Sequence, residues 1–193
     1  MGNSILFSKS KKYKSLADKI LTESKLISIL EQSGKVELTG SYPADLMMNG
    51  DIDIYVINSF SKNKVLNAFN KIVKSCKFNG YLFYDWKIDK HPGFPSGYYV
   101  GLKTKKYNER WKIDIWFITK KEVQKVKYFK LKEIPVNKEK KLAILKFKDY
   151  RNRFNKEMPS NVIYDAVLKN NILKLSEFKE YLAIYRKVDS RRD

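Results

Sequence analysis

Apolar residues recur along the chain with two different periods, which predict where helices and strands lie. Between residues 15 and 31 they recur every three or four positions, which predicts a helix ending before Gly34. Residues 63–76 carry the clearest helical stripe, with apolar side chains at intervals of four, three, one and three. Three further helices are predicted over residues 138–155, 160–169 and 176–187.

Runs rich in β-branched and aromatic residues predict five strands, at residues 35–38, 51–57, 81–88, 98–103 and 111–118. The last three follow one another, the first two of them separated by the breaker-rich segment HPGFPSG, which favours a meander. This order of elements predicts an α+β (α/β) fold, a mixed sheet flanked by helices and followed by a small helical lobe. We expect a first domain over residues 1–136 and a basic helical lobe, packed on it, over residues 137–193.

The composition is that of a globular protein. The chain has 193 residues, 43% of them hydrophobic, which is enough to bury a core. No apolar run approaches the roughly 20 residues of a spanning helix, and the N-terminus lacks the charge order of a secretory signal. A cytoplasmic location and no membrane partner are therefore expected. The single cysteine and single histidine exclude an internal disulfide and the usual zinc clusters.

The net charge of +19 indicates a polyanionic partner. Residues 120–156 hold 14 basic and 4 acidic side chains, so this segment contributes +10 of the total. The alternative is a genome that favours lysine codons, but such a bias would spread lysine evenly, whereas a phosphate-binding surface is local. The basic residues predicted to bind nucleic acid lie on the helix at 138–155 or just after it: Lys146, Lys148, Arg151, Arg153 and Lys156. The aromatic residues of this helix, at positions 147, 150 and 154, are expected to face the core.

Three aspartates interrupt strands that otherwise read as buried. Asp51 and Asp53 are two residues apart in the strand at 51–57 and therefore share a face, while Asp114 interrupts the strand at 111–118. If the two strands are adjacent, the three carboxylates meet. Carboxylates this close need a compensating cation, and hard oxygen ligands select Mg²⁺ or Mn²⁺. Two ions would hold the attacking and leaving oxygens of a phosphoryl or nucleotidyl transfer.

The pair Gly40-Ser41, followed by Asp51-Ile52-Asp53 and later by Asp114, resembles the signature of the DNA polymerase beta-like nucleotidyltransferase superfamily. The resemblance covers residues 15–118. It implies a nucleotidyltransferase-type sheet in which a Gly-Ser turn opens a helix beside the first strand, and in this chain a short helix or turn is expected after Gly40-Ser41. Here Ser41 is followed by Tyr42 and Pro43, where relatives often carry a small or basic residue, so the second half of the turn is expected to differ.

The resemblance also implies roles for individual residues. Asp51, Asp53 and Asp114 would be the catalytic carboxylates and the metal ligands, with Asp114 next to the acceptor hydroxyl. Gly40 and Ser41 would hold the triphosphate of a nucleoside triphosphate such as ATP, the glycine by letting the backbone approach and the serine from a helix N-terminus.

The acceptor is not determined by the resemblance, because the superfamily contains polymerases, RNA tailing enzymes and enzymes that modify proteins or antibiotics. A polycationic antibiotic would be repelled by this chain, whereas RNA would be attracted. The leading hypothesis is template-independent transfer to the 3′ end of RNA, with tRNA-like RNA as the first choice. The alternatives are transfer to a protein or small molecule, as in toxin, defence or resistance enzymes, and an inactive RNA-binding module.

Other side chains near the carboxylates have two interpretations each. Lys112 shares the face of Asp114 and would pair either with it or with a phosphate. Tyr55 and Trp116 fall on the same face and belong either to the sheet core or to a surface that stacks a base. His91, in the segment HPGFPSG, is interpreted as a loop residue rather than a general base.

Overall fold

The computed structural model describes residues 2–88, 94–126, 128, 130–155 and 158–189. The chain divides into two compact units. One is Lys11–Glu133, and the other combines the described residues of Met1–Ser10 and Ile134–Asp193. The first unit contains the sheet and the second is helical. The predicted domain boundary at residues 136 and 137 stays a prediction. His91 and Lys156 lie outside the described residues.

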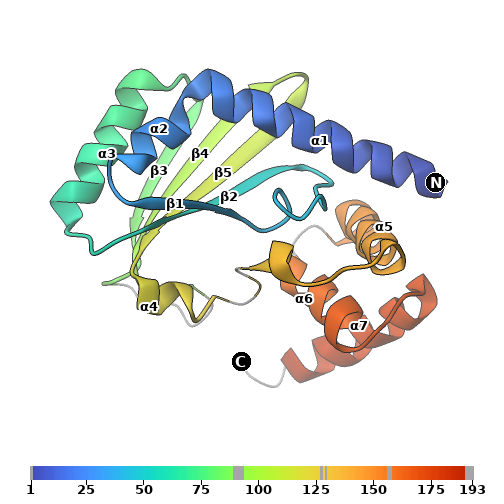
Figure 1. Ribbon diagram of the computed structural model, residues 1–193. Coiled ribbons are helices and arrows are strands. Elements are labelled where there is room, and N and C mark those ends of the chain that lie inside the picture. Colours follow the sequence, from blue (N-terminus) through green and yellow to red (C-terminus); the bar gives the residue numbers. More distant parts are fainter. Residues whose placement is uncertain (1, 89–93, 127, 129, 156–157, 190–193) are drawn as a thin grey trace. The chain divides into compact units, whose positions relative to one another are not determined.

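Five strands form one mixed sheet in the order β1-β2-β5-β4-β3 (Figure 1). Strands β2 and β5 pair in parallel, and every other pair is antiparallel. The three later strands form the predicted meander. The observed bounds are β1 (Lys35–Thr39), β2 (Gly50–Ile57), β3 (Gly80–Asp85), β4 (Tyr98–Lys106) and β5 (Glu109–Ile118). The α+β fold class is therefore confirmed.

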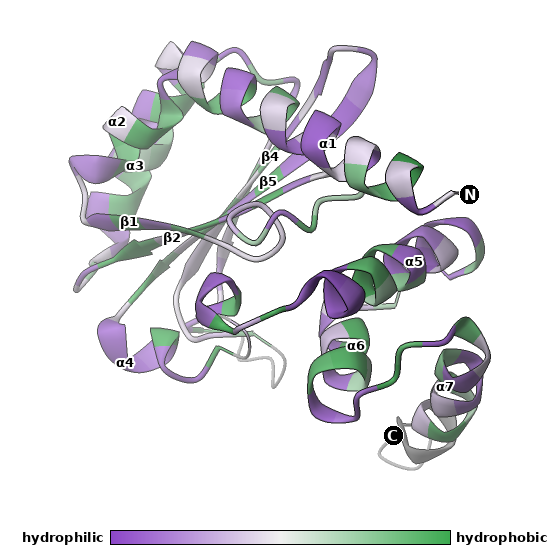
Figure 2. Cartoon of the chain, turned by 45° about the vertical axis from the view of Figure 1, so that its right-hand side comes forward, coloured by the Kyte–Doolittle hydropathy of each residue, from purple (hydrophilic) through white to green (hydrophobic). Residues whose placement is uncertain are grey.

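Helices α1 (Asn3–Ser24), α2 (Leu26–Glu31) and α3 (Lys62–Ser75) lie on one side of the sheet (Figure 1). Helix α1 alternates hydrophilic and hydrophobic residues along its length (Figure 2), as expected for a helix that covers a core with one face. The apolar side chains that alternate along the strands point into that core, among them the fully buried Ile52, Ile54, Ile113 and Ile115.

The single helix predicted over residues 15–31 is two helices. Lys25 adopts a left-handed backbone conformation, with φ 54°, and separates α1 from α2. The apolar period continues across this break because Leu26 and Leu30 still reach the core, each fully buried. The prediction for α3 is confirmed to within one residue, and the hydroxyl of Ser61 accepts a hydrogen bond from the backbone N–H of Lys64 at its start.

The opposite face of the sheet carries the polar side chains that alternate with the apolar ones along the same strands. Helix α4 (Lys120–Val123) follows β5, and its Val123 packs with Tyr55 and Trp116 in a small separate cluster. Beyond α4 the first unit ends with a short 3₁₀ helix, η1 (Leu131–Glu133). This face is the one on which the aspartates lie.

The helical unit is built from α5 (Lys138–Phe154), α6 (Ser160–Tyr164), a π-helical turn η2 (Asp165–Lys169) and α7 (Leu175–Asp189). Its core contains Phe147 and Phe178, whose rings stack with centroids 4.1 Å apart. The helix predicted over residues 160–169 is therefore one short α-helix that continues as the π-helical turn. Among the described residues, no helix is both long and apolar enough to cross a bilayer.

Candidate active site

The parallel pairing of β2 with β5 brings the three aspartates together. Asp53 lies directly opposite Asp114 in the register, and Asp51 lies opposite Lys112. One carboxylate oxygen from each aspartate lies within 4.8 Å of the others. The strand adjacency on which the predicted cluster depended is thus confirmed. The isoleucines that flank Asp53 and Asp114 along their strands point to the opposite face and are fully buried, which fixes the backbone that carries these carboxylates.

Both oxygens of Asp114 contact a donor. Tyr99 of β4 donates from its hydroxyl to Oδ1 at 2.6 Å, and the Lys112 Nζ atom lies 2.6 Å from Oδ2. Burial, the hydrogen bond to Asp114 and the nearby carboxylates raise the pKa of Tyr99 well above its usual value. Tyr99 therefore stays protonated and remains a donor across the physiological pH range.

Lys112 shows the strength of the negative field at this site. Burial alone lowers the pKa of its ammonium, but Asp114, and then Asp51 and Asp53, outweigh that effect and raise it. The two sequence interpretations of Lys112 are thus resolved in favour of a pair with Asp114 in this structure. Asp114 binds this ammonium, Asp51 and Asp53 add to the negative field around it, and all three supply the hard oxygen donors that Mg²⁺ and Mn²⁺ prefer. The residues present therefore fit a divalent cation.

Gly40 sets the turn after β1 against the carboxylates. Its φ is +68°, and a β-carbon added there would lie 2.3 Å from Oδ2 of Asp53. Only glycine satisfies both conditions, because it has no side chain to collide and no penalty for a left-handed backbone. Ser41 follows directly and is 8% exposed. The predicted Gly-Ser pair thus lies beside Asp53.

Of the short helix or turn expected after Gly40-Ser41, the structure has the turn, and the helix N-terminus expected at Ser41 is absent. Residues 40–45 form a turn, closed by the backbone N–H of Leu46 bonding to the carbonyl of Ser41. Tyr42, where the sequence departs from the family pattern, attaches the turn to α1. Its hydroxyl donates to Asp18 of α1 at 2.5 Å, and Lys14 lies over its ring. The second half of the turn is therefore fastened to α1, and no helix dipole is available to a phosphate at Ser41.

Tyr55 and Trp116 lie on the carboxylate face, as their strand parity predicted. They are only 8% and 9% exposed and pack with Val123 of α4. The core interpretation of these two residues is therefore the correct one. The sequence motifs did not identify Tyr99, although it alternates with the core residues Tyr98 and Val100 in β4 and so falls on the carboxylate face.

The basic residues predicted on α5 do not share one solvent face. Lys148 is 2% exposed, with its ammonium 5.1 Å from the ring centroid of Tyr164, and Arg151 is 8% exposed and donates to Ser160 at 2.8 Å. The expectation that Lys148 and Arg151 meet phosphates in solvent is wrong. The buried face includes Phe147, as predicted, but it also includes Lys148 and Arg151, and it leaves Phe154 71% exposed.

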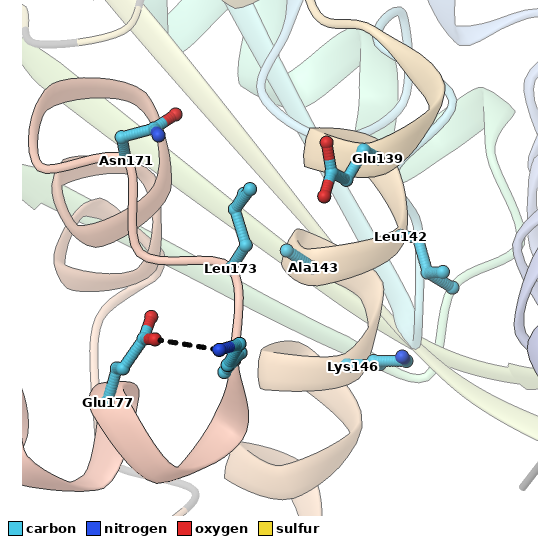
Figure 3. A pocket seen from close by; sticks show the side chains of 8 residues that line it. Glu139, Leu142, Ala143, Lys146, Asn171, Leu173 and Glu177 are labelled. Atoms are coloured by element: carbon cyan, nitrogen blue, oxygen red, sulfur yellow. Dashed lines mark ion pairs between the residues drawn. The ribbon is translucent and has the colours of Figure 1, made fainter.

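The other two described basic residues of α5 are more accessible. Arg153 pairs with Asp149 at 2.7 Å and is half exposed. Lys146 lines a cavity of about 330 Å³ beside the chain segment that leads into α7, together with Glu139 and Glu177 (Figure 3). Their assignment to nucleic-acid binding stays a prediction.

No protein-family model and no curated protein sequence matches the chain. Three of the solved structures that resemble it can be compared. The RNA terminal uridylyl transferase Cid1 is 17% identical, with a TM-score of 0.47 over 76% of this chain and 40% of its own. The STING-associated c-di-GMP synthase CdnE from Capnocytophaga granulosa is 14% identical, with a TM-score of 0.48 over 93% of this chain and 67% of its own. Small alarmone synthetase 1 of Bacillus subtilis is 7% identical, with a TM-score of 0.39 over 93% of this chain and 92% of its own.

Each of these three structures is less than 25% identical to the chain and has a TM-score below 0.5. The chain spans 40% of the length of the Cid1 chain. The candidate site is assigned from this chain's own residues: the glycine turn beside Asp53 and the cluster of Asp51, Asp53 and Asp114.

Proposed function

We propose that the chain is a metal-dependent nucleotidyltransferase that moves a nucleoside monophosphate from a nucleoside triphosphate to the 3′ hydroxyl of an RNA, without a template. The observation that carries the proposal is the cluster of Asp51, Asp53 and Asp114, whose ligand oxygens lie within 4.8 Å of one another on two adjacent strands. A rigid cluster of three carboxylates is costly to a fold unless it holds a cation.

Asp51, Asp53 and Asp114 would hold Mg²⁺ or Mn²⁺, with two ions expected. When bound, the metal would lower the pKa of the acceptor hydroxyl and balance the charge of the leaving group. The acceptor oxygen forms a bond to the α-phosphorus, the bond from that phosphorus to the bridging oxygen breaks, and pyrophosphate leaves. We assign the proton of the acceptor hydroxyl to Asp114, which Tyr99 and Lys112 keep oriented.

The triphosphate is assigned to the turn at Gly40 and Ser41. Because Gly40 brings the backbone against Asp53, a phosphate bound at this turn would lie next to the metal ligands. With no helix at this point, the donors available to the phosphates are the Ser41 hydroxyl and the N–H groups of the turn.

RNA is the proposed acceptor because of the charge of the chain. A net charge of +19 attracts a polyanion and repels small polycationic acceptors. Among cellular RNAs, tRNA-like molecules are the first to test.

The proposal predicts the behaviour of the Asp53→Asn variant. The substitution removes a metal-holding charge from the middle of the cluster, so transfer should fall at least about a hundredfold while the fold is kept. The measurement is incorporation of labelled nucleoside triphosphates into total cellular RNA, protein and small molecules. Asp85→Asn is the matched control, because Asp85 ends β3 and pairs with Lys62 outside the cluster.

The outcomes separate the alternatives. Label in RNA that Asp53→Asn abolishes and Asp85→Asn retains would support the proposal. Label found only in protein or in a small molecule would show that the chain is a nucleotidyltransferase whose acceptor is not RNA. No label in any fraction, from a protein that binds RNA, would reduce the chain to an RNA-binding module.

A further inference from the structure

The hairpin of β4 and β5 carries four basic side chains on the carboxylate face of the sheet. Lys103 lies directly opposite Lys112, and Lys105 lies directly opposite Arg110. All four alternate with residues of the helix-covered face, and all four are exposed. We call this set, Lys103, Lys105, Arg110 and Lys112, the hairpin patch.

Like charges directly opposite each other on antiparallel strands are destabilising. The hairpin patch contains two such pairs, two residues apart along the strands and therefore neighbours on the same face. Of its four members, only Lys112 makes an ion pair among the described residues, and that pair is with Asp114. The arrangement therefore costs stability that an anion bound from outside would restore.

The helix-covered face of the same hairpin is built differently. There Lys106 pairs with Glu23 of α1 at 2.9 Å, and Glu109 pairs with Lys12 at 3.1 Å. The chain thus provides an acid for the basic residue on one face and leaves the other face cationic. A lysine-rich composition alone does not explain a difference between two faces of one hairpin.

The hairpin patch also lies close to the candidate active site. Lys112 contacts Asp114, and Asp114 lies opposite Gly101, two residues further along the same strand pair and on the same face. The two rungs of the patch are about 7 Å apart, since a strand rises about 3.4 Å per residue. Successive phosphates along a single nucleic-acid strand have a comparable spacing, so one strand would meet both rungs.

We infer that the hairpin patch binds the last phosphodiester groups of a single-stranded RNA acceptor and directs its 3′ hydroxyl toward Asp114. This inference rests on the proposed function, since it gives the acceptor its path to the carboxylates. It also moves the expected RNA contact from α5, where Lys148 and Arg151 are buried, to the edge of the candidate active site.

The test compares two triple variants that remove the same charge. The patch variant combines Lys103→Gln, Lys105→Gln and Arg110→Gln, and leaves Lys112 in place because it contacts Asp114. The control variant combines Lys64→Gln, Lys74→Gln and Lys77→Gln. Its residues are exposed, lie on or just after α3 and make no ion pair within the described parts of the chain.

The measurement is the binding of a short labelled oligoribonucleotide, followed by fluorescence anisotropy over a salt series. The patch variant should lose at least about tenfold in affinity at low salt, and its slope of log affinity against log salt should flatten by about 2, at about 0.7 per phosphate. The control variant should change little. The melting midpoint of the patch variant should stay level or rise, because two like-charged pairs are removed.

Two results would overturn the inference. One is an equal loss of RNA affinity in both triple variants, which would make the attraction a matter of total charge. The other is loss of nucleoside triphosphate binding with RNA binding unchanged, which would assign the patch to the nucleotide.

The same experiments distinguish a failure of the proposed function from a failure of the hairpin-patch inference. If the wild-type protein labels no acceptor but the two triple variants differ in RNA binding as described, the transferase is wrong and the patch remains an RNA surface. If the wild-type protein labels RNA and the patch variant binds and labels it as well as the control does, the patch inference alone is wrong.

Discussion

Gly40 links the backbone of the turn directly to the candidate catalytic carboxylates. A methyl group at this position would lie 2.3 Å from Oδ2 of Asp53, and the φ of +68° is unfavourable for any residue with a side chain. The same glycine therefore determines both the shape of the turn and the orientation of Asp53. This double constraint explains why the Gly-Ser pair and Asp53 belong to one site although 12 positions separate Ser41 from Asp53.

The Gly40→Ala variant is expected to lose both stability and metal binding. The strained backbone should lower the free energy of unfolding by about 1–3 kcal/mol, and the collision should displace Asp53 from the cluster. Denaturant unfolding and Mn²⁺ titration measure the two effects. Gly80→Ala is the control, since a β-carbon there meets nothing closer than 3.4 Å. Unchanged Mn²⁺ affinity in Gly40→Ala would contradict the assigned role.

At the scale of elements, α1 is fastened to the β4–β5 hairpin by its polar residues. Tyr13 donates to Glu109 at 2.9 Å, and Tyr107 donates to Glu23. The sequence pattern indicated the helix but not this contact, because Tyr13 and Glu109 are 96 residues apart. The break at Lys25 was also hidden, since the apolar period of a helix continues through a single left-handed residue whose neighbours remain buried.

The contact between Tyr13 and Glu109 predicts a pH dependence. Burial, together with the hydrogen bond and the charge of Glu109, raises the pKa of Tyr13 from 10.0 to about 12. A phenol whose pKa is higher in the folded state contributes stability below pH about 10 and loses it as the pH rises to about 12. Unfolding free energies measured from pH 9 to 12, roughly the range over which this phenol titrates, should therefore fall less steeply in Tyr13→Phe than in the wild type. Identical slopes in the two proteins would contradict this account.

At the scale of the whole molecule, the net charge of a segment differs from the number of its cations that are exposed and free to meet a polyanion. The segment 120–156 carries +10 of the +19, yet Lys148 and Arg151 are buried and Arg153 pairs with Asp149. The hairpin patch contains fewer cations but leaves them exposed on one face. Counting charge along a sequence window gives no information on the direction of each side chain, and direction decides which cations a polyanion meets.

The whole protein should be stabilised by a divalent cation. Mn²⁺ at about 100 times its dissociation constant should add about 2.7 kcal/mol to the unfolding free energy, because it binds the folded cluster and relieves the repulsion between the carboxylates. For a chain of this size that corresponds to a rise in melting temperature of about 5–10 °C over the protein in EDTA. Thermal unfolding with and without Mn²⁺ measures it. Asp53→Asn should show little of the rise, and an equal rise in that variant would place the ion elsewhere.

The sequence by itself determined the features that depend on local periodicity. Strand alternation put Asp51 and Asp53 on one face, and the helical stripe located α3, because backbone geometry repeats every two or 3.6 residues wherever the element lies. The ordered Gly-Ser and aspartate motifs indicated the fold, and the sheet agrees with them.

Only the tertiary structure decided which segments are neighbours. The parallel pairing of β2 with β5 placed Asp114 opposite Asp53, and the pairing of β4 with β5 brought Tyr99 to Asp114 and Lys103 to Lys112. On α5, the position of the helical core buried Lys148 rather than Phe154. These outcomes depend on contacts between residues far apart in the chain, and packing against such neighbours, rather than local period, selects the side of a helix or strand that is buried.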